Sequence, residues 1–347
     1  MNSTASDTTG IAPEIQKLAP VILAEIQTAK SILLHCHPSP DPDSVGSALA
    51  MKFALEGMGK KATVIRGDSP IPEAFMHFPG ATTISMKGFA EINHADFDLF
   101  ISLDCSSPDR ISAEYASFAQ NLPFKVINID HHASNVNFGS INLVERTLPA
   151  TAQILYELFT VWNVTFTREI SGNLFIGMYT DTGGFRHTGT TVSTFMAASR
   201  LAAVATDFPD LISRMYNSNT PATLAFQGAA LSNIETFLDG RLALSSVSHA
   251  VLKQKNITPA DMGGVQISTI LRSVKGWNID VEMVELAPGL IKMSLRSQDE
   301  KQFDVSQLAL AFGGGGHKVA SGATIKGLSL DEAKKQVVAK AKELYTL

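Results

Sequence analysis

Short apolar runs that each lead into aspartate or histidine constrain the fold of this chain more than any other feature. Three of them lie in its first half: Ile32–Leu34 before His37, Leu99–Leu103 before Asp104, and Phe124–Ile129 before Asp130, His131 and His132. Each run has the length and the apolar character of a strand that is covered on both faces. Longer stretches with apolar residues at helical spacing separate the runs. This alternation predicts an α/β fold with a mainly parallel sheet and flanking helices.

The expected elements of this first region alternate along the chain. We predict strands at Ser31–Leu34, Ala62–Ile65, Leu99–Leu103 and Lys125–Ile129, and helices at Val45–Met58, Ala152–Trp162 and Arg168–Tyr179. In open parallel sheets, ligands gather beyond the carboxyl ends of the strands. Since the acidic and histidine residues follow the strands at that edge, we expect them to share one site.

The pattern changes after about Thr191. Apolar spacing is helical from there to about Leu238, with one clear break at residues 217–221, where Pro221 suits the first turn of a new helix. Beyond this stretch we predict strands at Leu242–Val247, Ile279–Glu285 and Leu290–Leu295, and a last helix at Leu330–Tyr345.

A chain of 347 residues suits two domains. We predict a first domain over residues 1–216 and a second, smaller α/β domain over residues 217–347. Within the first domain, residues 1–12 are expected to be disordered, because the start is polar and rich in serine and threonine. Residues 191–216 are expected to form a helical connector.

Composition excludes several classes of function. The net charge of −5 argues against a broad basic face that binds long duplex DNA. No apolar run approaches the roughly 18–20 residues of a membrane helix, and the first residues lack the pattern of a secretory signal. We expect a cytoplasmic protein without membrane contact, in which Cys36 and Cys105 are buried free thiols.

Acidic and histidine residues at the ends of apolar elements indicate a metal site. The candidates are His37, Asp41, Asp43, Asp104, Asp130, His131, His132 and Asp181. Clustered carboxylates repel one another, and bound divalent cations remove that repulsion. Oxygen ligands with some imidazole favour Mn²⁺ or Mg²⁺ over structural zinc, and Mn²⁺ suits histidine better. Two such ions can stabilise both the attacking and the leaving oxygen of a displacement at phosphorus. The alternative for Asp43 or Ser44 is an N-cap alone.

A glycine run near the end of the chain is the second strong feature. Gly313–Gly316 precedes His317 and Lys318, and glycines there let backbone N–H groups approach an anion closely. The run is not a Walker motif. Arg272 and Arg296 are candidates for bidentate contact with phosphate. The alternatives are a flexible surface turn for the glycines and surface ion pairs for the arginines.

Taken in order, these motifs resemble the DHH phosphoesterase superfamily, in the branch with a GGGH-type C-terminal domain. The series comprises His37-x-x-Pro40-Asp41-x-Asp43, Asp104, Asp130-His131-His132, Asp181, Ser294-Leu295-Arg296-Ser297 and Gly314-Gly315-Gly316-His317. Within the superfamily the chain is most similar to the nanoRNase/pAp phosphatase group, over about residues 32–324.

The resemblance implies roles for these residues. One metal ion would be held by His37, Asp41 and Asp104, and the other by Asp43, Asp104, His131 and Asp181. Asp104 would bridge the ions, Asp130 would orient a ligand, and His132 would lie near the substrate phosphate. The second domain would bind the nucleotide through Arg272, Arg296, Gly314, Gly315, Gly316 and His317, with the active site in the cleft between the domains.

The activity implied is a Mn²⁺-dependent hydrolysis of short oligoribonucleotides such as nanoRNA and pApA, of pAp, or of both, to mononucleotides. The alternative is a stand-alone (cyclic) dinucleotide phosphodiesterase or another exonuclease or phosphatase of the superfamily. A nucleotide-binding module without activity would have lost a metal ligand, and none is lost. Pro42 stands where relatives often have glycine, and Gln153 where many carry an acid, which leaves the preferred substrate open. A homodimer through the first domain is compatible with the resemblance.

Overall fold

The computed structural model describes residues 10–187, 189–217, 219–263 and 267–345. It divides into two compact units, Met1–Ser218 and Asn219–Leu347. The predicted disorder at residues 1–12 falls largely on residues 1–9, which lie outside the described residues. Ile11 and Ala12 pack against the first unit's core. Among the described residues, no helix has the length and apolar character needed to cross a membrane.

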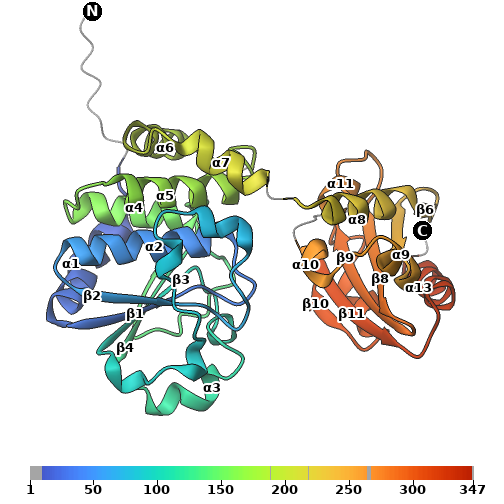
Figure 1. The fold of residues 1–347 in the computed structure, drawn as a ribbon, viewed down its shortest axis with the longest axis horizontal. Coiled ribbons are helices and arrows are strands. Elements are labelled where there is room, and N and C mark those ends of the chain that lie inside the picture. Colours follow the sequence, from blue (N-terminus) through green and yellow to red (C-terminus); the bar gives the residue numbers. More distant parts are fainter. Residues whose placement is uncertain (1–9, 188, 218, 264–266, 346–347) are drawn as a thin grey trace, which may run out of the picture. The chain divides into compact units, whose positions relative to one another are not determined.

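The first unit is built on a parallel five-stranded sheet (Figure 1), which confirms the predicted fold class. Its strands, in the order β2-β1-β3-β4-β5, are β2 (Lys61–Ile65), β1 (Ser31–His35), β3 (Leu99–Leu103), β4 (Lys125–Asp130) and β5 (Ile141–Val144). Four of them match predicted strands. β5 was not predicted, because its four residues are too short and too mixed in polarity to stand out.

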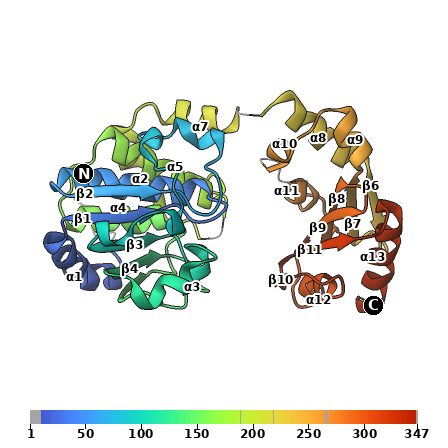
Figure 2. The same cartoon turned by 60° about the horizontal axis from the view of Figure 1, so that its bottom comes forward.

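Helices cover one face of this sheet, and short turns cover the other (Figure 2). The helical side holds α1 (Pro13–Thr28), α2 (Pro42–Gly57), α4 (Thr151–Val161), α5 (Arg168–Asp181), α6 (Val192–Val204) and α7 (Phe208–Tyr216). The turns η1 (Glu73–His77) and η2 (Ala81–Thr83) also pack on this side. The other side holds α3 (Tyr115–Phe118) and the 3₁₀ turns η3 (Phe89–Glu91), η4 (His94–Asp96), η5 (Pro108–Arg110) and η6 (Ala119–Asn121). The strands are therefore buried on both faces, as predicted.

Two local features place polar residues of the first unit at one edge of its sheet. Helix α2 begins at Pro42 rather than Val45, and its N-cap is Asp41, whose carboxylate accepts the Ser44 N–H at 2.9 Å. The alternative of a cap at Asp43 or Ser44 is therefore wrong. Helix α5 lies close to α2 because Gly177 has no side chain, and a Cβ there would stand 2.6 Å from an Asp43 oxygen.

The second unit contains a six-stranded mixed sheet in the order β10-β11-β9-β8-β7-β6. Its strands are β6 (Ile234–Phe237), β7 (Leu242–Val247), β8 (Ile279–Ala287), β9 (Leu290–Ser297), β10 (Gly315–His317) and β11 (Ala320–Lys326). Its helices are α8 (Pro221–Ser232), α9 (His249–Gln254), α10 (Pro259–Gly263), α11 (Ile267–Leu271), α12 (Val305–Leu310) and α13 (Leu330–Leu344). The helical prediction through Leu238 is wrong at β6, where pairing with β7 overrides local spacing.

The two faces of this second sheet are covered to different extents. Helices α12 and α13 cover one face with a continuous apolar core. On the other face, α8, α9 and α11 pack over the part of the sheet formed by β6, β7 and β8. Towards β9 and β11 that face carries exposed side chains, among them Lys292 and Thr324. The register therefore decides which polar residues share this open part of the sheet.

Candidate functional site

His37 and Asp41 lie on the connection from β1 to α2. The buried His37 ring has Nε2 3.4 Å from Oδ2 of Asp41 and 3.5 Å from Oδ2 of Asp104. Its Nδ1 lies 3.0 Å from the Pro38 carbonyl oxygen, which fixes the ring orientation. One ligand atom from each of the three side chains lies within 4.8 Å of the other two. These residues can hold one cation.

Asp104 lies at the centre of the site. It follows β3 with a φ of 58°, a left-handed conformation that is strained for a residue with a side chain. Its N–H donates to the Ile129 carbonyl oxygen at 3.0 Å, which ties it to β4. While Oδ2 faces His37, Oδ1 lies 3.5 Å from Nε2 of His131 and accepts the Thr151 hydroxyl at 2.9 Å. One carboxylate thus presents different oxygens to two histidines.

Asp43, His131 and Asp181 form a second group whose ligand atoms lie within 4.8 Å of one another. Nε2 of His131 is 3.2 Å from Oδ2 of Asp181, at the end of α5. The buried Asp43 accepts the backbone N–H groups of Thr151 and Ala152 at 2.7 and 3.0 Å. Those residues begin α4, so the positive end of that helix faces the Asp43 carboxylate.

Asp130 and His132 form a pair beside these groups. Nδ1 of His132 lies 2.7 Å from Oδ1 of Asp130, and the Asn135 amide donates to Oδ2 at 2.6 Å. Burial alone would raise the pKa of Asp130, but the hydrogen bonds from His132 and Asn135 hold that pKa below its usual range. The Asp130 hydrogen bond in turn raises the pKa of His132. The His132 side chain is 44% exposed, so it can meet a ligand.

The electrostatics of the whole cluster fit a divalent metal centre. Burial raises the pKa of Asp43 well above its usual range, and the neighbouring Asp104 and Asp181 add to that rise. Burial would lower the pKa of His131, but the carboxylates around it raise it to about 9. Among the described residues, these carboxylates form ion pairs with histidines alone. Divalent cations would supply the positive charge that this cluster of carboxylates requires.

Sequence reasoning missed several residues that support this centre. Nη2 of Arg110, in η5, lies 3.1 and 3.3 Å from the two ring nitrogens of His37. Thr151 supports Asp104 and Asp43, and Asn135 supports Asp130. None belongs to an acidic or histidine cluster. The only available signal was that Arg110 and Asn135 follow soon after such clusters.

The second unit brings predicted substrate residues onto one face of its sheet. Arg296 of β9 lies opposite Ala320 of β11, and Ala320 lies opposite His317 of β10. Directly opposed residues of antiparallel strands point to the same face. Arg296 and His317 therefore share a face with only the small Ala320 between them. Gly315 and its partner Gly322 lie two positions further along the same face.

The glycines at 314, 315 and 316 differ in how much space the fold leaves for a side chain. A Cβ on Gly314 would stand 2.1 Å from the Gly322 carbonyl oxygen. Gly316 has a φ of 139°, and a Cβ there would stand 2.6 Å from the Ala320 carbonyl oxygen. A Cβ on Gly315 would meet no atom within 4 Å. The fold thus requires glycine at 314 and 316, whereas the open space at Gly315 leaves room for a ligand to approach.

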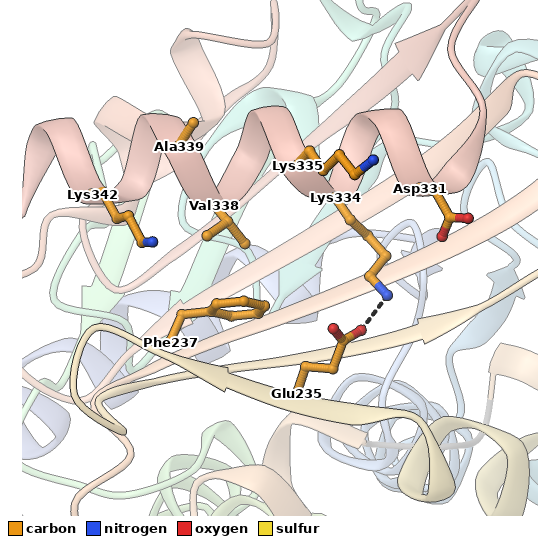
Figure 3. Close-up of a pocket in the computed structure, with 8 residues that line it drawn as sticks. All are labelled: Glu235, Phe237, Asp331, Lys334, Lys335, Val338, Ala339 and Lys342. Carbon is orange, nitrogen blue, oxygen red and sulfur yellow. Dashed lines mark hydrogen bonds and ion pairs between the residues drawn. The ribbon is translucent and has the colours of Figure 1, made fainter.

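A surface cavity of about 450 Å³ lies elsewhere in the second unit, between β6 and α13 (Figure 3). Phe237 and Val338 contribute apolar surface, and the Lys334 ammonium is paired with Glu235. None of the residues predicted to bind metal or substrate lines it. It is therefore separate from the sites described above.

Two family descriptions match this chain. Residues 31–178 match the DHH family, N-terminal domain, and residues 246–345 match the DHHA1 domain. The matched regions contain the metal cluster, except Asp181, and the row formed by Arg296, Ala320 and His317. The chain belongs to the DHH family.

Individual relatives agree with this membership. The chain is 29% identical to the bifunctional oligoribonuclease and PAP phosphatase NrnA of Thermus thermophilus, over 94% of each chain. An exopolyphosphatase-related protein from Bacteroides fragilis has a similar structure, with a TM-score of 0.83, 25% identity, and coverage of 98% of this chain and 100% of that one. A structure of the exonuclease RecJ bound to manganese shares the fold, with a TM-score of 0.54, 15% identity and 94% coverage of each chain.

Proposed function

We propose that this protein is a metal-dependent phosphoesterase that hydrolyses short oligoribonucleotides, including pApA, and pAp to mononucleotides. The observation that carries the proposal is the placement of Asp104, whose two oxygens face His37 on one side and His131 on the other. A bridging carboxylate between two histidine-containing groups suits two-metal hydrolysis of phosphoesters. The activity named for the Thermus relative, which is similar over nearly the whole chain, supports this substrate class.

The ligand sets follow from the two groups of side chains. His37, Asp41 and Asp104 would hold one ion, and Asp43, Asp104, His131 and Asp181 the other. When bound, the ions would lower the pKa of a water molecule and neutralise charge on the phosphate. We favour Mn²⁺ over Mg²⁺, because imidazole ligands suit Mn²⁺ better, and manganese is bound in the related RecJ structure.

His132 is the group we assign to proton donation. Asp130 engages its Nδ1, which leaves Nε2 available for a second partner. The Asp130 hydrogen bond raises the pKa of His132, which favours the protonated ring that a proton donor requires. Asp130 orients the ring, and Asn135 in turn fixes Asp130. Donation to the leaving oxygen would convert it to a hydroxyl group.

The second unit would bind the substrate. Arg296 and Arg272 suit contact with a phosphate, and the His317 side chain lies on the same face as Arg296, beside the open space at Gly315. The net charge of −5 is consistent with short rather than long nucleic acid. The two free, buried cysteines suit a reducing, cytoplasmic setting. A homodimer stays a prediction.

The decisive experiment is product formation by the purified protein with Mn²⁺. We would supply pAp, pApA, a five-nucleotide RNA, inorganic pyrophosphate and a polyphosphate in parallel. AMP from pAp, or mononucleotides from the RNAs, is the expected result. Turnover of pyrophosphate or polyphosphate alone would overturn the proposal, and relative rates would rank the preferred substrates.

A further inference from the structure

The second unit contains a buried carboxylate that the fold leaves without a partner. Asp280, on β8, is 2% exposed. Neither of its carboxylate oxygens has a hydrogen-bond partner. A buried charge without a partner destabilises a protein, so such groups are rare unless they serve another purpose. Asp280 lay in a predicted strand and carried no motif, which is why the sequence did not indicate it.

Strand register places Asp280 beside the predicted substrate residues. It lies directly opposite Arg296 of β9, so its side chain points to the same face as Arg296. One row across four strands therefore contains Asp280, Arg296, Ala320 and His317. The carboxylate stands at one end of this row, where α11 begins to cover the sheet.

Arg272, directly after α11, lies near the same place. Gln298 directly follows β9. Its side-chain amide donates to the Arg272 carbonyl oxygen at 3.1 Å and to the Trp277 carbonyl oxygen at 2.6 Å. These bonds fix the Arg272 backbone at the end of the β8–β9 pair that carries Asp280. The charges of Arg272 and Arg296 both act on the Asp280 carboxylate.

The charged groups around Asp280 are few. Asp280 lies opposite Arg296 of β9, and the charge of Arg272, directly after α11, also acts on it. Its neighbour on β7 is the uncharged Ala243. On its own strand, Glu282 lies two positions along the same face, opposite Ser294. Both guanidinium groups act on Asp280, whereas Lys292 and Arg296 act on Glu282.

We propose that Asp280 is a positioning residue that orients the Arg296 and Arg272 guanidinium groups toward a phosphate of the substrate. In the structure, Nη1 of Arg296 donates to the Leu295 carbonyl oxygen at 2.9 Å, so Arg296 would reach the carboxylate opposite it by a change of rotamer. A guanidinium held by a carboxylate keeps its remaining N–H donors in a fixed direction. The inference rests on the proposed function for the identity of the substrate. The changes in melting temperature that it predicts do not depend on that function.

The raised pKa of Asp280 shows that its ionised form destabilises the folded chain. Burial raises the pKa of Asp280 to about 7, although Arg272 and Arg296 oppose that rise. A carboxyl group with a raised pKa binds its proton more tightly in the folded than in the unfolded chain. Its ionisation therefore removes stability as pH rises from about 4 to about 7. An uncharged group of the same shape would avoid that loss.

The test compares wild type with Asp280→Asn and with Glu282→Gln. Asp280→Asn should raise the melting temperature at pH 8 and change it little at pH 5. The same variant should raise KM for pApA at least tenfold and change kcat less than threefold. Glu282→Gln removes a carboxylate two positions away on the same face and should change KM less than twofold. A residue needed only for folding would instead lower the melting temperature when replaced.

A double-mutant cycle with Arg296→Ala tests whether Asp280 acts through that arginine. If it does, Asp280→Asn should add less than twofold to KM in the Arg296→Ala background. Additive losses, or an unchanged KM in the single variant, would overturn the inference. AMP affinity, measured by calorimetry, keeps the test independent of turnover. Should wild type hydrolyse no RNA, the proposed function fails, while the melting temperatures and AMP affinities of the variants still decide the role of Asp280.

Discussion

The candidate sites of the two units differ in the sign of the charge that their side chains carry. In the first unit, five aspartates crowd one edge of a parallel sheet, and they raise the pKa values of His37 and His131 to about 10 and about 9. In the second unit, arginines and a histidine gather on an open sheet face beside a single carboxylate. The first arrangement calls for cations and the second for an anion. Both demands agree with the proposed metal-dependent hydrolysis of a phosphoester.

The largest loss of activity is expected when the carboxylate shared by both metal groups is removed. Asp104→Asn should lower kcat/KM at least about 1,000-fold, which corresponds to about 4 kcal/mol of transition-state stabilisation. The physical reason is that each oxygen of Asp104 faces a different histidine. Steady-state hydrolysis of pAp at saturating Mn²⁺ measures the loss.

Asp109→Asn is the matched control, because Asp109 is exposed on the turn η5 and makes no contact with the cluster among the described residues. It should retain wild-type activity. Retention of more than a few per cent of activity by Asp104→Asn would show that Asp104 does not bridge the ions.

Removal of Arg296 should give the next largest effect. Arg296→Ala should raise KM for pApA about 10- to 100-fold, the range expected for loss of a hydrogen bond to a charged group. Since Arg296 lies in the second unit and no metal ligand is altered, kcat should fall much less. Mn²⁺ affinity, titrated in parallel, should stay unchanged. Loss of Mn²⁺ affinity in this variant would contradict the division of roles between the units.

Gly315 offers a smaller and sharper test. Gly315→Ala should fold normally, because its Cβ would meet no atom within 4 Å. It should raise KM about tenfold if the substrate approaches the backbone there. Gly314→Ala is the contrasting variant and should lower the melting temperature, because its Cβ would stand 2.1 Å from a carbonyl oxygen. Equal destabilisation by both substitutions would remove the functional argument for Gly315.

The sequence predicted the first site better than the second, for a physical reason. Residues at the carboxyl ends of parallel strands meet at one edge whatever the strand order, so His37, Asp104 and His131 could be grouped from spacing alone. In the second unit, the relation of Asp280 to Arg296 depends on antiparallel register, which spacing does not give. Arg110 and Thr151 were missed because their contacts depend on loop geometry.

The boundaries of elements show the same limit. Helix α2 was predicted to begin at Val45, yet it begins at Pro42. Proline fits that position because the first N–H groups of a helix need no intrahelical acceptor. The edge strand β6 was taken for helix, because its four residues follow a helical stretch directly. Pairing with β7, rather than local preference, determines it.

The smallest expected effect is a shift in the pH dependence of kcat. If His132 donates a proton, kcat should fall as pH rises through the pKa of His132, since only the protonated ring can donate. The Asp130 hydrogen bond raises that pKa above its usual value, so the descending limb should lie on the alkaline side of an ordinary histidine. Asp130→Asn removes the negative partner and should move the limb to lower pH. Asn135→Ala leaves that charge in place and should move it less. A limb that stays in place in Asp130→Asn would assign the proton donor to another group and would leave Asp130 a purely structural role beside the metal ligands.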